Sequence, residues 1–234
     1  ELQGVPDVAL RWGLNYELFP DGDPTPDQAR AALAAYYACV SFIDAQIGIL
    51  LDALDAHGLS ERTAVVLLSD HGFHLGDRGL WSKLTLFEAA TRVPLIVRAP
   101  GAPANGQVCD EVVELVDLLP SLAELCDFRA PGALEGTSFV PLLHAPQRAW
   151  NSAAFSLCSR GDGQWIGCSI RTRRHRYNEW RHGTALAAEL YDLEADPLES
   201  VNRIADASQA ALRDELAQRL RAGWQAARPP GSGS

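Results

Sequence analysis

The chain has 234 residues, of which 47% are apolar, so it is long enough for one large domain, or one and a half, with a proper core. Its formal net charge of −10 argues against general binding of nucleic acids or of anionic membranes. A membrane span is not predicted, because the most apolar segment carries Ser41, Asp44 and Gln46. The chain lacks methionine and begins at Glu1, so we expect it to be an excised piece of a longer protein.

The first predicted element is a long helix. Residues 1–24 are rich in Pro, Gly and Asp and are predicted to form a loop. Residues 25–28, TPDQ, then combine a Thr N-cap, a Pro in the first position and a Gln three residues after the Thr, which is the pattern of a helix start. Apolar residues recur at helical spacing as far as Leu54, with Cys39 expected on the buried face, and Gly58 is suited to end the helix.

Two apolar strands follow. The run at residues 63–69 is bulky and β-branched, which is typical of a strand that is buried on both faces. A second strand is predicted at 93–98 and a helix at about 116–126. This alternation indicates an α/β layer, whose sheet we expect to be completed by residues outside this chain.

The remainder of the chain has a different pattern. A final amphipathic helix is predicted over about 208–226. Before it come four short strand candidates separated by Gly or charged turns, among them a turn at 161–163: 153–159, 165–171, 175–180 and 189–193. We therefore predict two domains, an α/β part over 1–147 and a small α+β subdomain, made of an antiparallel sheet and a terminal helix, over 148–234.

The first apolar strand ends in the residues that carry chemistry. Asp70 and His71 come directly after it, and Lys83 lies twelve residues after His71. Ligands bind at the carboxyl ends of strands in an open α/β sheet. A carboxylate is a hard donor suited to calcium or magnesium, and an imidazole also suits manganese or zinc. A capping Asp followed by a hydrogen-bonded His would explain Asp-His-Gly equally well when the flanking residues are ignored.

Three segments of this sequence resemble the sulfatases of the alkaline phosphatase superfamily, within them the iduronate-2-sulfatase-like group. The most specific is SDHGFHLGDRGLWSKLTLFEAATRVPLIVRAPG, at 69–101. The others are YYACVSFIDAQIGILLDALD, at 36–55, and CSIRTRRHRYNEW with ELYDLEADPLESVN, at 168–180 and 189–202. The resemblance implies an alkaline-phosphatase-like sheet sandwiched by helices, of which this chain is the C-terminal part, and a sulfuric ester hydrolase activity.

The resemblance also implies roles for single residues. Asp70 and His71 match metal ligands of the family, and Lys83 matches the lysine that contacts the sulfate. The family uses one divalent cation, usually calcium with manganese or magnesium as alternatives, and a formylglycine made in a Cys/Ser-x-Pro-x-Arg motif. None of the five cysteines lies in such a motif. We therefore expect the formylglycine in an N-terminal portion of the same enzyme, and we expect this chain alone to be inactive.

Four further residues are candidates for substrate binding. Phe73 and His74 follow the predicted ligands and are expected to line the mouth of the pocket. Arg174 and Arg176 belong to a basic run, in which strand alternation would place them on one face as a cationic wall for sulfated substrates. The alternative is a solvated hairpin whose arginines pair with nearby glutamates.

Two other functions stay open at this stage. A phosphodiesterase or phosphonate monoester hydrolase of the same superfamily would share the Asp-His-Gly strand end. A non-catalytic fragment would explain why the nucleophile motif is missing. The expected partners are a sulfated small molecule or sugar and the N-terminal portion of the enzyme, with no nucleic acid and no membrane. The compartment is unknown from the residues, although the resemblance favours a periplasmic, secreted or lysosome-like one.

Overall fold

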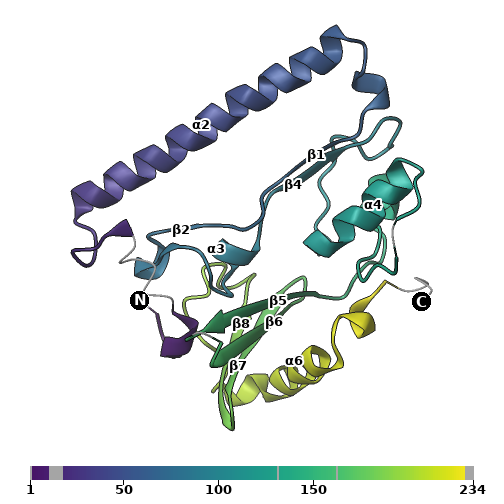
Figure 1. The fold of residues 1–234 in the computed structure, drawn as a ribbon. Helices are drawn as coiled ribbons and strands as arrows, with labels where there is room; N and C mark the ends of the chain where they lie inside the picture. The colour runs from purple at the N-terminus through teal and green to yellow at the C-terminus, as the bar shows by residue number, and fades with distance from the viewer. Residues whose placement is uncertain (1, 11–17, 131, 162, 230–234) are drawn as a thin grey trace.

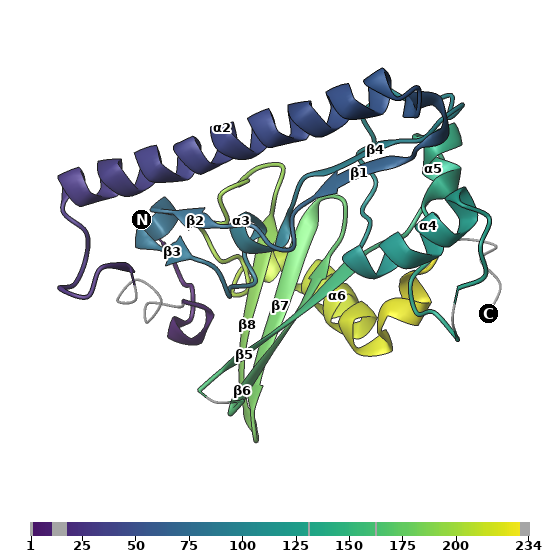
Figure 2. The same cartoon turned by 45° about the horizontal axis from the view of Figure 1, so that its top comes forward.

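The structure, a computed structural model, describes residues 2–10, 18–130, 132–161 and 163–229. Along the chain come a long helix, a layer of short strands and helices, and a four-stranded sheet with a C-terminal helix (Figure 1). Figure 2 shows the long helix as a rod along one side, with the four-stranded sheet on the other side of the short strands and helices. Short 3₁₀ helices join these elements: η1 (Asp7–Ala9), η2 (Ser60–Arg62), η3 (Asp77–Gly79), η4 (Leu115–Asp117), η5 (Ala207–Gln209) and η6 (Trp224–Ala227).

The long helix α2 (Pro26–Ala56) begins where the sequence predicts it. The Thr25 hydroxyl accepts a hydrogen bond from the Gln28 backbone N–H at 3.3 Å, and the Gln28 side chain accepts one from the Thr25 N–H at 2.8 Å. This reciprocal capping box satisfies two donors that the first helical turn leaves unpaired. The helix ends at His57, followed by Gly58 with φ +66°. Both predicted ends are therefore confirmed.

No residue of α2 is buried, and Cys39 is exposed. The prediction of a buried Cys39 is wrong for the described structure, because only a few contacts, such as that between the rings of Tyr36 and Phe73, join α2 to the next layer. By length and composition alone, α2 is also apolar enough to cross a membrane. The core helices of soluble proteins pass the same test.

Strands β1 (Val65–Leu68) and β4 (Leu95–Arg98) confirm the two predicted apolar strands. They pair with each other antiparallel, in a two-stranded sheet. Most of their residues are half-buried or exposed, including Leu67 and Ile96. The burial on both faces expected for the first strand is therefore wrong, because the described residues form a packed core on one side of the pair only, where Leu95 and Val97 contact the cluster of Phe139, Leu142 and Trp150.

A small hairpin lies between these two strands. Its strands, β2 (His74–Leu75) and β3 (Trp81–Ser82), pair so that His74 faces Ser82. The short helix α3 (Glu88–Thr91) follows, and then β4 returns to β1. After β4 come α4 (Leu118–Leu125), which confirms the helix predicted at 116–126, and α5 (Val140–His144).

The C-terminal sheet confirms all four predicted strands. They run antiparallel in chain order as β5 (Ala154–Arg160), β6 (Trp165–Arg171), β7 (His175–His182) and β8 (Ala185–Asp192), followed by the helix α6 (Ala210–Ala222). β8 begins earlier than predicted because the alanine-rich segment before Glu189 also pairs with β7. Of the predicted turn at 161–163, Asp162 lies outside the described residues, and both flanking glycines have positive φ.

Each face of the C-terminal sheet supports a core. On one face Ile170, Tyr177 and Leu190 pack with residues of α6. On the other face Trp180 and Tyr191 join a core cluster with residues that precede position 148, among them Leu80, Leu86 and Phe87. The predicted boundary after 147 thus separates two parts that share one core, and the division into two domains stays a prediction.

Candidate active site

The three residues predicted to carry chemistry meet at one place. Lys83 Nζ lies 2.9 Å from His71 Nε2, and Asp70 Oδ2 lies 3.5 Å from the same nitrogen. The Asp70 side chain is 83% exposed and that of His71 36%, so both can reach a ligand. A carboxylate, an imidazole and an ammonium group therefore share one accessible site after the end of β1.

The β2–β3 hairpin explains how residues twelve apart come together. Since His74 pairs with Ser82, the segments that enter and leave the hairpin run side by side. Ser82 and Leu84 both have positive φ, at 72° and 65°, and they turn the chain on either side of Lys83. The ends are held by a 2.7 Å hydrogen bond between His74 Nε2 and Thr85 Oγ1. Local structure thus aims Lys83 back at the His71 ring.

The tautomer of His71 follows from its neighbour. Nδ1 lies 2.9 Å from the carbonyl oxygen of Gly72, which can only accept, so Nδ1 carries the proton. The lone pair is then on Nε2, which faces Lys83 and Asp70. A metal-binding histidine is oriented in this way when its other nitrogen donates to a carbonyl.

Asp70 and His71 fit part of a divalent cation site. Their donor atoms are a hard carboxylate oxygen and the imidazole Nε2, whose single lone pair accepts from the Lys83 ammonium at 2.9 Å in this structure. In the part of the chain that the structure describes, no three His, Cys, Asp or Glu side chains come together. These two residues could therefore supply only some of the ligands that such a cation needs.

The site opens onto a large cavity of about 1650 Å³. Asp70, His71 and Lys83 lie in its wall, together with Arg171 and Arg173 from the C-terminal sheet region. The cavity lies between the short strands and that sheet. Its size leaves room for a substrate and for additional protein groups.

His74 does not lie at the mouth of this cavity, which corrects the prediction. The side chain is fully buried; it bonds to Thr85 and its ring packs edge-on against Phe87, with the ring centroids 6.1 Å apart. Burial, aided by the charge of Arg78, lowers the pKa of His74 from 6.5 to about 4. The physical reason is that pairing in β2 turns this side chain into the core.

Phe73 is half-buried, and its ring lies 5.6 Å from that of Tyr36 in α2. Neither Phe73 nor His74 is among the described residues that line the cavity. A substrate-binding role for Phe73 stays a prediction.

Arg174 and Arg176 do not form a shared exposed wall, so that prediction is wrong. Arg174 precedes β7, and its side chain is 55% exposed. It donates two hydrogen bonds to Asp192, of 3.0 and 2.6 Å. This contact lowers the pKa of Asp192 to about 2. The side chain of Arg176 is only 1% exposed, because within β7 it shares the sheet face of Trp180.

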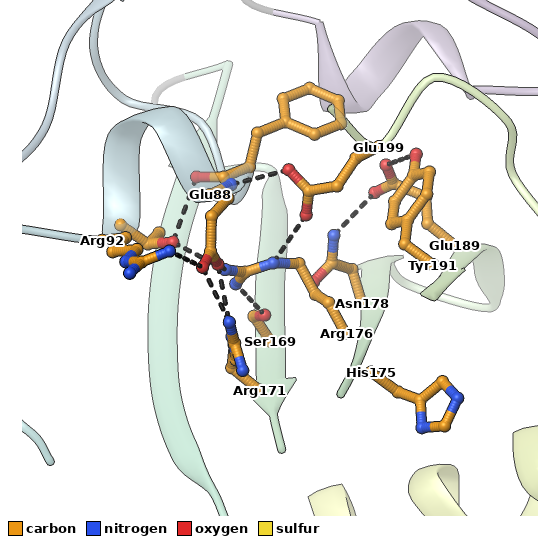
Figure 3. Close-up of polar contacts among 12 residues, drawn as sticks. Glu88, Arg92, Ser169, Arg171, His175, Arg176, Asn178, Glu189, Tyr191 and Glu199 are labelled. Carbon is orange, nitrogen blue, oxygen red and sulfur yellow. Dashed lines mark hydrogen bonds and ion pairs between the residues drawn. The ribbon is translucent and has the colours of Figure 1, made fainter. Parts of the chain in front are cut away.

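Arg176 belongs to a cluster of charges that the sequence prediction missed. We call Glu88, Arg171, Arg176 and Glu199 the buried ion cluster (Figure 3). Arg176 Nη2 donates to Glu88 Oε2 at 2.5 Å and Nε lies 2.7 Å from Glu199 Oε1, while Arg171 Nη2 donates to Glu88 Oε1 at 2.8 Å. A signal existed in the sequence: an arginine on the strand face of a core tryptophan needs a buried counter-charge.

Two opposing effects determine the pKa of Glu88 in the buried ion cluster. Burial by itself raises the pKa of Glu88, but the hydrogen bond from Arg171 and the charges of Arg176 and Arg171 outweigh it. The pKa of this carboxyl therefore lies below its ordinary value. Glu88 is thus charged at neutral pH and holds both arginines.

Two family models match most of the chain. The family model described as "Sulfatase" matches residues 16–128. The family model described as "N-sulphoglucosamine sulphohydrolase, C-terminal" matches residues 76–226. Together they include α2, the candidate site and the C-terminal sheet.

Individual relatives agree with these matches. A sulfatase of Formosa agariphila is 33% identical over 73% of this chain and 32% of its own length. Choline-sulfatase of Rhizobium meliloti is 31% identical over 77% of the chain and 34% of its own length. Iduronate 2-sulfatase of Mus musculus is 29% identical over 84% and 48% respectively. The chain thus spans between a third and a half of the length of these curated relatives.

Solved structures share the fold. BT4656, in complex with its substrate D-glucosamine-2-N,6-O-disulfate, superposes with a TM-score of 0.79 and 25% identity over 94% of this chain and 47% of that one. The phosphonate monoester hydrolase of Agrobacterium radiobacter gives 0.75 and 29% identity over 85% and 42%. Both enzyme classes therefore contain the arrangement of elements described above.

Proposed function

Because this chain belongs to the sulfatase family of the alkaline phosphatase superfamily, we propose that it forms the C-terminal part of a sulfuric ester hydrolase. The observation that carries this proposal is the meeting of Asp70, His71 and Lys83 within 3.5 Å at the end of β1, beside a large cavity. Asp70 Oδ1 also accepts from the His71 backbone N–H at 3.0 Å, as a capping aspartate does, but a structural turn would not require Lys83 beside the His71 ring.

Asp70 and His71 would hold a divalent cation, for which the exposed carboxylate favours calcium over softer metals. When bound, the cation would neutralise negative charge on the sulfate oxygens. The carbonyl of Gly72 keeps the Nδ1 proton of His71 in place, so the lone pair is on Nε2, which accepts from Lys83 in this structure and would bind a cation in place of that contact.

Lys83 would bind the sulfate. An ammonium group has three donors and only one is used by His71, so two can reach sulfuryl oxygens as charge develops on them. Composition supports a specific role: Lys83 is the only lysine among the 20 lysine and arginine residues of the chain. The compact ammonium, in contrast to the planar guanidinium used everywhere else, would suit a point contact with the reacting group.

The nucleophile and the remaining metal ligands would come from a portion of the sulfatase fold that this chain does not contain. A formylglycine there would supply the attacking group. We also propose that this portion covers α2 and the β1–β4 pair. The support is that α2 exposes large apolar side chains, such as Ile43 and Leu50, and that the chain spans only 47% of the solved sulfatase relative.

The substrate class would be a sulfated sugar or another sulfated small molecule. The support is the sulfated sugar bound by BT4656 and the presence of Arg173 in the cavity wall of this chain. Phe73, two residues after His71, is proposed to border the substrate. A phosphonate monoester as the substrate is the second candidate, and it is favoured by the 29% identity to the Agrobacterium hydrolase.

The test uses this chain joined to the remainder of the sulfatase fold. We expect calcium-dependent hydrolysis of 4-nitrophenyl sulfate, and a loss in kcat of about 100- to 1000-fold in Lys83→Ala, as for the removal of an oxyanion donor. Asp70→Ala should weaken calcium binding in calorimetry. Arg203→Ala, an exposed cation after β8 and outside the cavity wall, is the matched control and should change neither.

Faster turnover of a phenyl phosphonate monoester than of the sulfate would establish the second candidate. Unchanged calcium affinity in Asp70→Ala would mean that this residue only caps the turn. The chain by itself should show no turnover, and metal-dependent turnover above that of its Lys83→Ala variant would contradict the division of the site between two portions.

A further inference from the structure

The short helix α3 lies directly against the turn that carries Asp70 and His71. The N–H of Gly72 donates to the carbonyl of Ala90 at 2.9 Å. The two backbones are so close that a Cβ on Gly72 would lie 2.1 Å from the carbonyl oxygen of Ala89. Since the Gly72 carbonyl also holds the His71 ring, the place of α3 determines the place of the proposed ligands.

The side chains of the buried ion cluster also contact α3 (Figure 3). Glu199 Oε2 accepts from the Glu88 backbone N–H at 2.7 Å. Arg176 donates to the Glu88 carboxylate at 2.5 Å and to the Thr91 hydroxyl at 2.9 Å. The side chains of Arg176 and Glu199 are 1% and 0% exposed, so water does not compete for these contacts.

Glu199 also reaches the segment that presents Lys83. Arg78, near the tip of the β2–β3 hairpin, lies with Nη2 3.7 Å from Glu199 Oε2, and its guanidinium stacks over the Phe87 ring at 4.8 Å. One buried carboxylate therefore contacts both α3, which supports the Asp70–His71 turn, and the hairpin, whose end carries Lys83.

The cluster is better suited to fix geometry than to add stability. A helix of four residues is not stable by itself, and the side chain of Phe87 provides no cap for α3. A buried ion pair gains little net stability, because desolvation offsets the attraction. The guanidinium of Arg176, however, donates directional hydrogen bonds to Ser169, Glu88 and Thr91, and its ion pair with Glu199 at 2.7 Å holds it in place between them.

We propose that Glu199 and Arg176 are positioning residues, which act through α3 and the β2–β3 hairpin to hold the Asp70–His71 turn in register with Lys83. The consequence for catalysis rests on the proposed sulfatase function, whereas the mechanical coupling does not. Arg176 belongs to the cavity wall, although its side chain is only 1% exposed, and Glu199 is not among the described residues that line the cavity.

The test compares Glu199→Gln with the unchanged protein by amide hydrogen exchange. The variant keeps the volume and an acceptor for the Glu88 N–H but removes the charge that faces Arg176 and Arg78. We expect exchange at Gly72 to become about 10- to 100-fold faster, the factor that corresponds to the loss of one hydrogen bond to a charged group, about 1.5–3 kcal/mol of local stability. The amides of α6, which packs on the other face of the sheet, serve as the internal control and should keep their rates. Glu194→Gln changes an exposed partner of Arg174 and should leave the exchange rate at Gly72 unchanged.

In the chain joined to the remainder of the fold, Glu199→Gln should lower calcium affinity and kcat while KM stays unchanged. Equal acceleration at Gly72 and in α6 would overturn the proposal, because it would indicate general destabilisation. Unchanged exchange at Gly72 would overturn it as well. If Glu199→Gln does not fold, Thr91→Val, which removes the contacts of the Thr91 hydroxyl with Arg176 and with the Phe87 carbonyl, decides by the same readout, with Thr91→Ser, which keeps the hydroxyl, as its control. Hydrogen exchange needs no turnover, so this proposal and the sulfatase proposal fail separately.

Discussion

His71 and His74 lie three residues apart and have opposite surroundings. His71 is accessible; its Nδ1 donates to the Gly72 carbonyl, and its Nε2 accepts from Lys83. His74 is enclosed, and its Nε2 is 2.7 Å from the Thr85 hydroxyl. The difference is one of burial, and it converts the same imidazole from a proposed ligand into a neutral structural group.

His74 should make the protein sensitive to mild acid. Its pKa in the folded state, about 4, lies below the ordinary value of 6.5, so between these values the unfolded chain binds a proton that the folded one does not. Stability therefore falls as the pH falls through this window, by about 2 kcal/mol between pH 7 and pH 5. Urea unfolding at both pH values should show a smaller difference for His74→Gln than for the unchanged protein. Equal differences would mean that His74 is not the responsible group.

At the scale of elements, the site depends on two backbones in contact. β1 ends in the Asp70–Gly72 turn, and this turn rests on α3 without an intervening side chain. Only glycine permits that approach, since any Cβ would overlap the Ala89 carbonyl. The tripeptide Asp-His-Gly therefore contains two residues for chemistry and one for packing.

Gly72→Ala should separate the turn from α3. The added methyl must move backbone atoms, and overpacking of this kind costs about 1–3 kcal/mol in unfolding free energy. Gly48→Ala is the control: no atom lies within 4 Å of the added methyl in α2, and alanine favours a helix by about 1 kcal/mol over glycine. Thermal unfolding of both variants checks the prediction. If Gly72→Ala is as stable as the unchanged protein, the turn and α3 are not in contact.

At the scale of the whole molecule, the C-terminal part is well packed, whereas the long helix and the β1–β4 pair are not. The C-terminal sheet has cores on both faces, whereas α2 contributes no buried residue and the β1–β4 pair has no flanking strand among the described residues. Exposed apolar surface of this extent is typical of an interaction surface. The same helix passes a membrane-span test on length and composition, so an experiment must separate the two explanations.

Ile43 distinguishes a protein-covered helix from a membrane-bound one. In this chain it is 54% exposed, so Ile43→Ala should hardly change stability here. In the chain joined to the remainder of the fold, the same change should cost about 2–5 kcal/mol in urea unfolding, as for core residues. Asp52→Ala, an exposed change on the same helix, should stay within about 0.5 kcal/mol in both. Capture of the joined protein by lipid vesicles through α2 would favour the membrane instead.

The sequence by itself determined those features that depend on neighbours along the chain. The capping box at residues 25–28, the positions of the six strands predicted as such and the final helix all follow from local hydrogen bonding and from alternation. The juxtaposition of His71 with Lys83 followed from a family pattern, and a hairpin of short range produces it.

The tertiary structure alone decided which side chains are covered. Alternation placed Arg176 on a face of β7 but could not tell that Glu88 and Glu199 close over it, since Glu199 lies 111 residues after Glu88. In the same way, nothing near His74 in the sequence indicates that Phe87 and Thr85 enclose it. Burial depends on contacts between distant segments, and these contacts set the charge state of a histidine and the role of an arginine, whereas local patterns determine only the element and the face.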